Sequence, residues 1–512
     1  MTDRGSPSGL GAGGGRYQVA APEAGGTDPQ AARRVIERGV RPLASSVDGV
    51  RFEFQASLHD LDLQVGGHVV LETGGPGRLG QVLSVRIARV EAADVDPAAP
   101  AAFQVRTAQG HGIVLDDGAR PFHDAVVRPA RSDEIADWLT ANRPQRAVLE
   151  IGEHLLAPGV PANLDAGGFN RHTFLCGQSG SGKTYSLGLV LERLLVETDL
   201  RLVVLDPNSD YVRLAEPRAG LDPAVADRYA AAARGVAVRR AGTAGDRIML
   251  RFAELDPAGQ AALLRLDPIA DREEYAALSA LLDAGERGRP LVGTFEDFFT
   301  TDQPGARELG LRAANLGVLD WPIWAREETG SLLAELENGD QRCLVVDLGS
   351  LSTPEEQSVV AEAVLSTLWR RRARREPVLV VIDEAHNVCP AAPRDAVTAL
   401  AAEYATRIAA EGRKFGLYLL LSTQRPQKVQ ENVVSQCDNL LLMRMNSAAD
   451  LEFLHAVFSF VPAGLLDRAS AFRQGHALVA GKVMPHAGYV RFGARTAEEG
   501  GADVPATWAA SR

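Results

Sequence analysis

Cysteine is scarce in this sequence. Four cysteines occur among 512 residues, and they lie far apart, at Cys176, Cys343, Cys389 and Cys437. No C-x-x-C pair exists, and no cysteine–histidine spacing suits zinc. These absences argue against a disulfide framework and against a zinc site, so the sequence predicts reduced thiols.

Long apolar runs are also missing. No stretch approaches the roughly 18 apolar residues of a membrane-crossing helix. The first residues, MTDRGSPSGLGAGGG, lack the apolar core of a signal peptide. We therefore expect a cytoplasmic protein without a membrane partner. The net charge of −12 argues against a generally basic nucleic-acid coat. It leaves room for a basic channel, because electrostatic footprints are local.

The composition and length predict a globular protein of two or three domains. Residues 1–40 are rich in glycine, alanine and proline, which predicts a disordered leader with a short helix over Pro29–Arg38. Residues 41–150 contain short alternating runs punctuated by glycine, proline and aspartate, which predict a small β-barrel. A helix over Asp133–Ala141 follows, with Ser132 as its N-cap.

Residues 151–495 change to an alternation of strands and helices. The strands are near-continuous apolar runs, as expected of parallel strands covered on both faces. They lie at 172–177, 200–207, 343–350, 378–386, 416–424 and 439–445. Helical patterns at about 214–340 predict an insertion or lid, a long helix follows the cap Thr353, and residues 496–512 are expected to be a flexible tail. The predicted class is α/β, a RecA-like doubly wound parallel sheet with a terminal hairpin behind the barrel.

The stretch Phe174–Leu195 is typical of a strand, a glycine-rich loop and a helix. Gly177, Gly182, Lys183 and Thr184 complete the pattern G-x-x-x-x-G-K-[ST]. The chain has only four lysines, so a chance match is rare. Backbone N–H groups and the helix N-terminus would hold phosphates, Lys183 would reach the β- and γ-phosphates, and Thr184 would bind Mg²⁺. The predicted ATP-binding residues are Gly177, Gln178, Ser179, Gly180, Ser181, Gly182, Lys183 and Thr184.

Polar residues follow two further predicted strands, at the point where each strand ends. Asp383 and Glu384 follow an apolar run about 200 residues after the loop. In a parallel sheet both would emerge at the carboxyl edge, where Asp383 would hold Mg²⁺ and Glu384 would act as general base. His386 either couples the nucleotide state to a neighbour or packs at the surface. Gln424 is predicted to sense the γ-phosphate, the alternative being a polar strand end before a proline turn.

Two basic segments are candidates for a role in trans or in binding nucleic acid. Residues 411–416, EGRKFG, contain Arg413, our first choice for an arginine finger supplied across a subunit boundary. Arg407 is the alternative finger, and a solvated helix end is the structural alternative. The run Arg370–Arg375 is interpreted as a solvated helix end, with nucleic-acid contact as the minority interpretation.

Six ordered motifs together resemble the HerA branch of the HerA/FtsK superfamily of P-loop ATPases, whose HAS-type β-barrel is similar to the β-rich N-terminal region. The resemblance spans roughly residues 50–490. The motifs are GQSGSGKT with Arg171-His172 before it, LDPNSDY (205–211), VVIDEAH (380–386), EGRKFG (411–416), STQRP (422–426) and SQCDNLLLMRM (435–445).

The resemblance implies a homo-hexameric ring that translocates double-stranded DNA with ATP and Mg²⁺ and works with a nuclease or another effector, in DNA end processing or phage defence. It also implies sites between subunits, with Arg413 acting in trans and Arg171 as a second trans contact. Asp210 replaces the glutamate of the family's D-P-H-G-E-Y motif, which leaves its role open. The alternatives are a nucleotide-dependent ring scaffold that activates a partner and a conjugation-type secretion ATPase.

Overall fold

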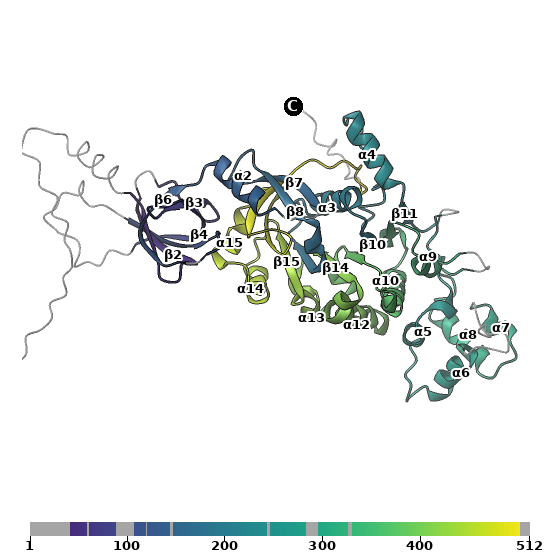
Figure 1. Ribbon diagram of the computed structural model, residues 1–512. Helices are drawn as coiled ribbons and strands as arrows, with labels where there is room; N and C mark the ends of the chain where they lie inside the picture. The colour runs from purple at the N-terminus through teal and green to yellow at the C-terminus, as the bar shows by residue number, and fades with distance from the viewer. Residues whose placement is uncertain are drawn as a thin grey trace, which may run out of the picture.

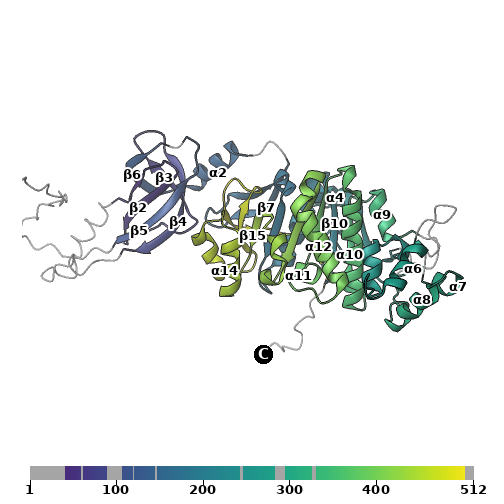
Figure 2. The same cartoon turned by 90° about the horizontal axis from the view of Figure 1, so that it is seen from below.

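The computed structural model describes residues 41–501, apart from 59–60, 89–106, 119, 144–146, 243–245, 283–294 and 326–329. The leader expected at residues 1–40 and most of the expected tail lie outside these residues. The barrel lies at one end of the molecule, a large sheet occupies its middle, and helices α5–α8 lie at the other end (Figures 1 and 2).

The N-terminal region forms a closed barrel with strand order β1-β2-β5-β4-β3-β6, as predicted. β2 alternates between exposed and buried residues, which places Phe52 and Phe54 inside. A Cβ at Gly110 or Gly112 of β5 would meet these rings at 2.3 Å, so glycine is required there. The strands are β1 (Leu43–Ser46), β2 (Arg51–Ser57), β3 (His68–Glu72), β4 (Arg78–Ile87), β5 (Thr107–Val114) and β6 (Phe122–Pro129).

The described strands of the second region form an eleven-stranded sheet in the order β11-β12-β10-β13-β14-β9-β15-β16-β17-β7-β8. The strands from β11 to β15 are parallel and the rest antiparallel, which confirms the RecA-like class and the terminal hairpin. Their bounds are β7 (Val148–His154), β8 (Pro161–Asp165), β9 (His172–Cys176), β10 (Arg201–Asp206), β11 (Val236–Arg239), β12 (Cys343–Asp347), β13 (Val378–Ile382), β14 (Leu417–Thr423), β15 (Cys437–Leu442), β16 (His476–Gly481) and β17 (Gly488–Phe492). The boundary that we placed at residue 150 therefore falls inside β7, a strand of this sheet.

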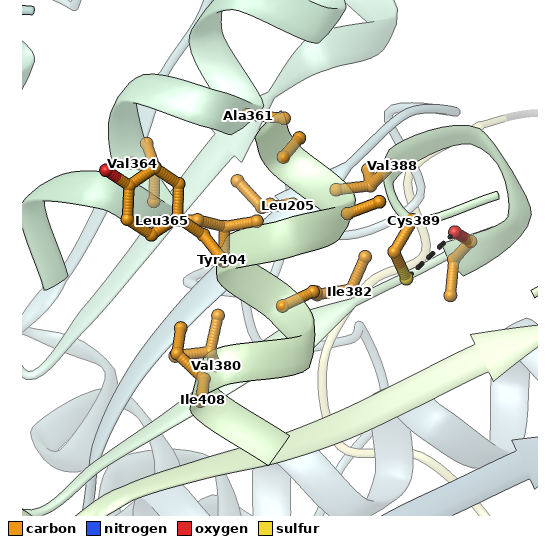
Figure 3. Packing of buried hydrophobic residues seen from close by; sticks show 14 of the residues in the cluster. Leu205, Ala361, Val364, Leu365, Val380, Ile382, Val388, Cys389, Tyr404 and Ile408 are labelled. Atoms are coloured by element: carbon orange, nitrogen blue, oxygen red, sulfur yellow. Dashed lines mark hydrogen bonds between the residues drawn. The ribbon is translucent and has the colours of Figure 1, made fainter. Parts of the chain in front are cut away.

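Helices cover both faces of the sheet. They are α3 (Lys183–Glu197) on one face, and α10 (Pro354–Arg370) and α12 (Ala396–Glu411) on the other. Leu379 and Val381 of β13 belong to the core layer with α3, whereas Val380 and Ile382 belong to the layer with α10 and α12. Figure 3 shows the second layer, in which Ile408 of α12 packs beside Val380. Successive side chains of β13 point to opposite faces of the sheet. Because helices cover both faces, every residue of the strand is apolar.

The helix starts were predicted with mixed success. Thr353 caps α10, since its Oγ1 accepts from the Glu356 N–H at 3.2 Å and Glu356 Oε2 accepts from the Thr353 N–H at 3.0 Å. Ser132 as the N-cap of α2 (Ser132–Ala141) was wrong. The N-cap is Arg131, whose N–H donates to Glu134 Oε2 at 2.9 Å, and Ser132 is the first helical residue.

The described residues of 214–340 contain six α-helices, and the region also contributes β11 to the sheet edge beside β12. β11 is only four residues long, VAVR, which is too short for its apolar residues to form a recognisable strand pattern in the sequence. The helices here are α4 (Pro223–Ala233), α5 (Pro257–Leu263), α6 (Arg272–Leu282), α7 (Asp297–Thr300), α8 (Ala306–Asn315) and α9 (Leu332–Asn338). The later ones are α11 (Ala385–Val388), α13 (Glu431–Val434), α14 (Ala448–Val457) and α15 (Ala463–Leu466). Among the described residues, no helix has the length and apolar character to cross a membrane.

The cysteines and the chain end complete the fold. All four cysteines are free and buried. The Cys389 thiol donates to the Ala385 carbonyl at 3.3 Å (Figure 3). Residues 496–501, where we expected a flexible tail to begin, pack against the chain instead. Ala497 is fully buried and forms an antiparallel bridge with Pro217.

Candidate nucleotide-hydrolysis site

The loop between β9 and α3 has the backbone of a phosphate cradle. Gly180 and Gly182 have φ values of +71° and +94°, which favour glycine. A Cβ at Gly177 would lie 2.7 Å from Met443 Cβ, so the loop also packs too closely there for a side chain. Ser179 is exposed at the tip. The glycines of the predicted motif therefore occupy positions that require them.

The segment after β15 holds this loop. The Gln178 N–H donates to the Arg444 carbonyl at 2.9 Å, and Gln178 Oε1 accepts from the Asn446 N–H at 3.1 Å. Arg444 Nη2 lies 3.4 Å from the Gly180 carbonyl. Arg444 Nε and Ser181 Oγ are buried and have no protein partner among the described residues. Sequence reasoning gave Arg444 no role, although it lies in a quoted motif.

The Lys183 ammonium joins the loop to two neighbouring strands. Its Nζ lies 2.9 Å from Asp383 Oδ1, 3.1 Å from Glu384 Oε1 and 3.1 Å from Ser422 Oγ. Lys183 is 5% exposed and Asp383 is fully buried. Burial by itself would lower the pKa of Lys183, but the charges of Asp383 and Glu384 outweigh it and raise the pKa. The lysine is therefore held as a cation.

The loop after β10 brings a third acidic residue to the site. Asp206 accepts the N–H groups of Asp210 at 3.0 Å and Tyr211 at 2.8 Å, which folds this loop back toward the strand. Asp210 Oδ2 then lies 3.5 Å from Thr184 Oγ1. The Tyr211 hydroxyl is 3.4 Å from Asp383 Oδ2. The aspartate that departs from the family motif therefore does reach the site.

Burial raises the pKa of two carboxyl groups in this acidic loop. Burial raises the pKa of Asp206 to about 7, against the backbone hydrogen bonds that lower it. Burial, together with repulsion from Asp383, raises the pKa of Asp210 to about 6. Both groups therefore titrate close to neutral pH, and added positive charge would favour their ionised forms.

Glu384 is held in a strained conformation. Its φ of +43° and ψ of 51° are left-handed, which costs about 1–3 kcal/mol for such a residue. Gln424 Nε2 donates to Glu384 Oε1 at 2.8 Å, and His386 Nδ1 lies 3.2 Å from Glu384 Oε2. Burial would raise the pKa of Glu384, but His386, Lys183 and Gln424 outweigh it and lower the pKa to about 2. His386 also contacts Thr423 Oγ1 at 3.1 Å, so it is part of this network.

Arg171 and Arg413 lie at the opposite edge of the sheet. They precede β9 and β14, whereas the loop and Gln424 follow these strands. Both contact Asp438 Oδ2, at 3.7 Å from Arg171 Nη1 and 2.7 Å from Arg413 Nη1. The two predicted trans arginines are thus brought together, away from the loop of their own chain.

The other arginines considered are engaged locally. Arg407 pairs with Glu403 on the exposed side of α12. In the run Arg370–Arg375, Arg372 stacks on the Trp369 ring at 4.4 Å. Further contacts join Arg370 to Thr367 and to the carbonyl of Glu254, Arg371 to Glu376, Arg372 to the carbonyl of Trp369, and Arg374 to the carbonyl of Glu337. These contacts favour a helix end over a nucleic-acid surface.

Comparisons with known proteins agree with the geometry. The family model described as "Helicase HerA, central domain" matches residues 149–305. The chain is 22% identical over 431 residues to the DNA double-strand break repair helicase HerA of Pyrococcus furiosus, covering 70% of this chain and 73% of the relative. It is 30% identical over 148 residues to the protein of the same name from Sulfurisphaera tokodaii, covering 27% and 29%. A probable helicase of Methanocaldococcus jannaschii is 21% identical, covering 70% and 69%.

Two solved structures have partial similarity to this chain. VirB4 of Thermoanaerobacter pseudethanolicus is 17% identical with a TM-score of 0.47, covering 69% of this chain and 98% of that one. The bacterial conjugative coupling protein TrwB is 13% identical with a TM-score of 0.43, covering 72% and 92%.

Proposed function

Because the chain is a HerA-like P-loop ATPase, an enzyme that hydrolyses ATP, we propose that it uses hydrolysis to move along double-stranded DNA as a homo-hexameric ring. The observation that carries the proposal is the convergence of Lys183, Asp383, Glu384 and Gln424 behind one glycine loop. The names of the relatives support DNA as the track, since they are helicases of double-strand break repair.

The residues of the site fit a magnesium nucleotide. Left-handed glycines of this kind let successive backbone N–H groups turn toward a phosphate, and the buried Ser181 hydroxyl has no protein partner in the described chain. Thr184 and Asp383 would hold Mg²⁺, which neutralises phosphate charge and orients the γ-phosphoryl group. Lys183 now balances two carboxylates, and a triphosphate would compete with them for the same ammonium.

This competition would activate Glu384 as the general base. Lys183, His386 and Gln424 together hold the pKa of Glu384 at about 2, which makes it a weak base. When Lys183 turns to the phosphates, Glu384 loses a cation and its pKa rises. Gln424 stays within hydrogen-bond distance of Glu384 and would orient the attacking water beside it.

The arginine pair supports sites that are shared between subunits. β9 has five residues, so Arg171 and the loop stand roughly 17 Å apart along the strand. Arg171 and Arg413 are 42% and 35% exposed at that edge. They are too far from the loop of their own chain and are open to a neighbouring subunit. An effector such as a nuclease, in end processing or phage defence, would work with this ring.

Displacement of a triplex strand from duplex DNA tests the proposal. We expect the wild-type protein with ATP to displace the third strand without an effector and Glu384→Gln to fail, because translocation requires repeated hydrolysis. Hydrolysis without displacement would reject the motor and support the ring scaffold. Recovery of the activity only in membrane fractions would support the secretion ATPase.

A further inference from the structure

The segment after β17 is anchored in α3, the helix that follows the glycine loop. Arg495 Nε donates to Glu192 Oε1 of α3 at 2.7 Å, and both side chains have no exposed surface. The Thr496 N–H donates to Glu192 Oε2 at 2.6 Å. A Cβ at Gly188 would lie 2.4 Å from Arg495 Cζ, so glycine leaves the space that the guanidinium fills. The helix is therefore shaped to receive this arginine.

Stability alone does not account for such an anchor. Moving two charges out of water costs several kcal/mol per ion, and a buried pair often only offsets that cost. Here Arg495 Nη1 and Nη2 also have no protein partner among the described residues. The pair fixes the position of the segment along α3. If Arg495 moved away, Glu192 would remain as an uncompensated charge in the core.

From this anchor the chain runs antiparallel to the loop after β10. The Arg218 N–H donates to the Thr496 carbonyl at 2.8 Å, and the Glu498 N–H donates to the Glu216 carbonyl at 2.8 Å. Further along, the Gly500 N–H donates to the Asp210 carbonyl at 3.1 Å. The segment Arg495–Gly501, which we call the C-terminal strap, thus joins α3 to the loop that contains Asp210.

The strap meets Asp210 at two glycines. A Cβ at Gly500 would lie 2.2 Å from the Ser209 carbonyl oxygen. Gly501 has a φ of +56°, and a Cβ there would lie 2.7 Å from Asp210 Oδ1. Only glycines allow the strap this close, and Asp210 lies between the strap and Thr184, 3.5 Å from the threonine hydroxyl.

We propose that the C-terminal strap is a positioning element that holds Asp210 beside Thr184, so that this segment sets how well the site accepts magnesium nucleotide. The physical basis is that the strap connects α3 with the acidic loop after β10. Arg495 is tied to α3, which begins at Lys183, and Gly500 is tied to the acidic loop. The proposal rests on ATP hydrolysis at this site, and Arg495 and Gly500 act through Asp210 without touching nucleotide.

A chain that ends at residue 499 tests the strap, because it keeps the Arg495 anchor and removes the Gly500 bond. We expect the KM for magnesium ATP to rise about fivefold to tenfold while kcat stays within about twofold. This pattern is expected when the lost interaction stabilises the bound substrate and the transition state equally. The melting temperature should stay within about 2 °C of wild type. A chain that ends at residue 505 keeps both glycines and is the matched control.

A point variant disturbs the same contact without removing any residue. Gly500→Pro removes the N–H that the Asp210 carbonyl accepts and adds a Cβ against the Ser209 carbonyl oxygen, so it should raise KM as the short chain does. Glu498→Gln weakens only the surface pair with Arg213, at 3.8 Å, and should leave KM unchanged. An unchanged KM in both the short chain and Gly500→Pro would overturn the strap. Hydrolysis that survives in Lys183→Ala would instead overturn the site itself, so the two failures are distinguishable.

Discussion

Lys183 Nζ lies 2.9 Å from Asp383 Oδ1, a pair separated by 200 residues in sequence and almost fully buried. The contact exists because β9 and β13 flank β14, so the loop after β9 and the carboxylates after β13 emerge at one edge. The ammonium is the charge that lets Asp383 and Glu384 lie close together in the core.

Removing this ammonium should abolish hydrolysis. Lys183→Ala leaves no cation for the phosphates and leaves Asp383 and Glu384 uncompensated, so we expect ATPase activity to fall at least about a hundredfold. A phosphate-release assay measures the loss, and thermal melting reports the expected drop in stability. Lys482→Ala, an exposed lysine, is the control and should behave as wild type.

Glu384→Gln should separate binding from hydrolysis. The amide keeps the shape of the side chain but accepts no proton, so we expect nucleotide binding to persist while turnover falls about a hundredfold or more. Binding of a fluorescent ATP analogue and phosphate release measure the two steps. Hydrolysis at the wild-type rate would show that Glu384 is not the base.

Gln424→Ala should shift the pH dependence of hydrolysis. Gln424 donates to Glu384 at 2.8 Å and helps to hold the pKa of that carboxyl low. Without the amide the pKa rises, so the acidic limb of the pH–rate profile should move to higher pH. Profiles of kcat/KM for both proteins test this, and coincident limbs would contradict it.

Complementation should reveal shared sites. Arg413→Ala and Lys183→Ala should each be inactive, since one lacks the trans cation and the other the loop lysine. In the proposed ring, mixed assemblies would contain some interfaces with both residues, so mixing should restore part of the activity. Arg407→Ala, on the exposed side of α12, is the control for loss of an arginine. No recovery after demonstrated subunit exchange would assign Arg413 to its own chain.

Acid should weaken the joint between the barrel and the sheet. His68 of β3 contacts His486 through their Nε2 atoms at 2.8 Å, and His154 of β7 stacks beside His486. Burial lowers the pKa of His68, with a contribution from His154, to about 4 from 6.5. Burial likewise lowers the pKa of His154 to about 4 from 6.5. The unfolded chain therefore binds protons first as pH falls below 6.5, and the free energy of unfolding should decrease from there to about pH 4.

Thermal unfolding across this pH range measures the effect. His486→Gln removes one titrating ring from the joint and should flatten the decrease in melting temperature. His123→Gln replaces an exposed histidine, 89% accessible, and should leave the slope unchanged. Equal slopes in all three proteins would show that the joint does not sense acid.

Much of the fold was readable from sequence, because its signals are local. The apolar run of β13 predicts a strand that is covered on both faces. The residues that directly follow it must therefore lie at the carboxyl edge of the sheet. The edge strand β11 was not predicted because a run of four residues is too short to show a strand periodicity. The predicted N-cap of α2 was wrong by one residue. Serine is usually preferred at an N-cap, but here Arg131 occupies that position and forms a capping box with Glu134.

By itself, the sequence determined the phosphate loop, since its glycines and lysine are contiguous and their backbone requirements are local. Only the tertiary structure decided that Asp438 gathers Arg171 and Arg413, and that Arg495 reaches Glu192 across 303 positions. Such contacts depend on the order in which strands and segments lie side by side. That order follows from the packing of the whole chain, and no short stretch of residues encodes it.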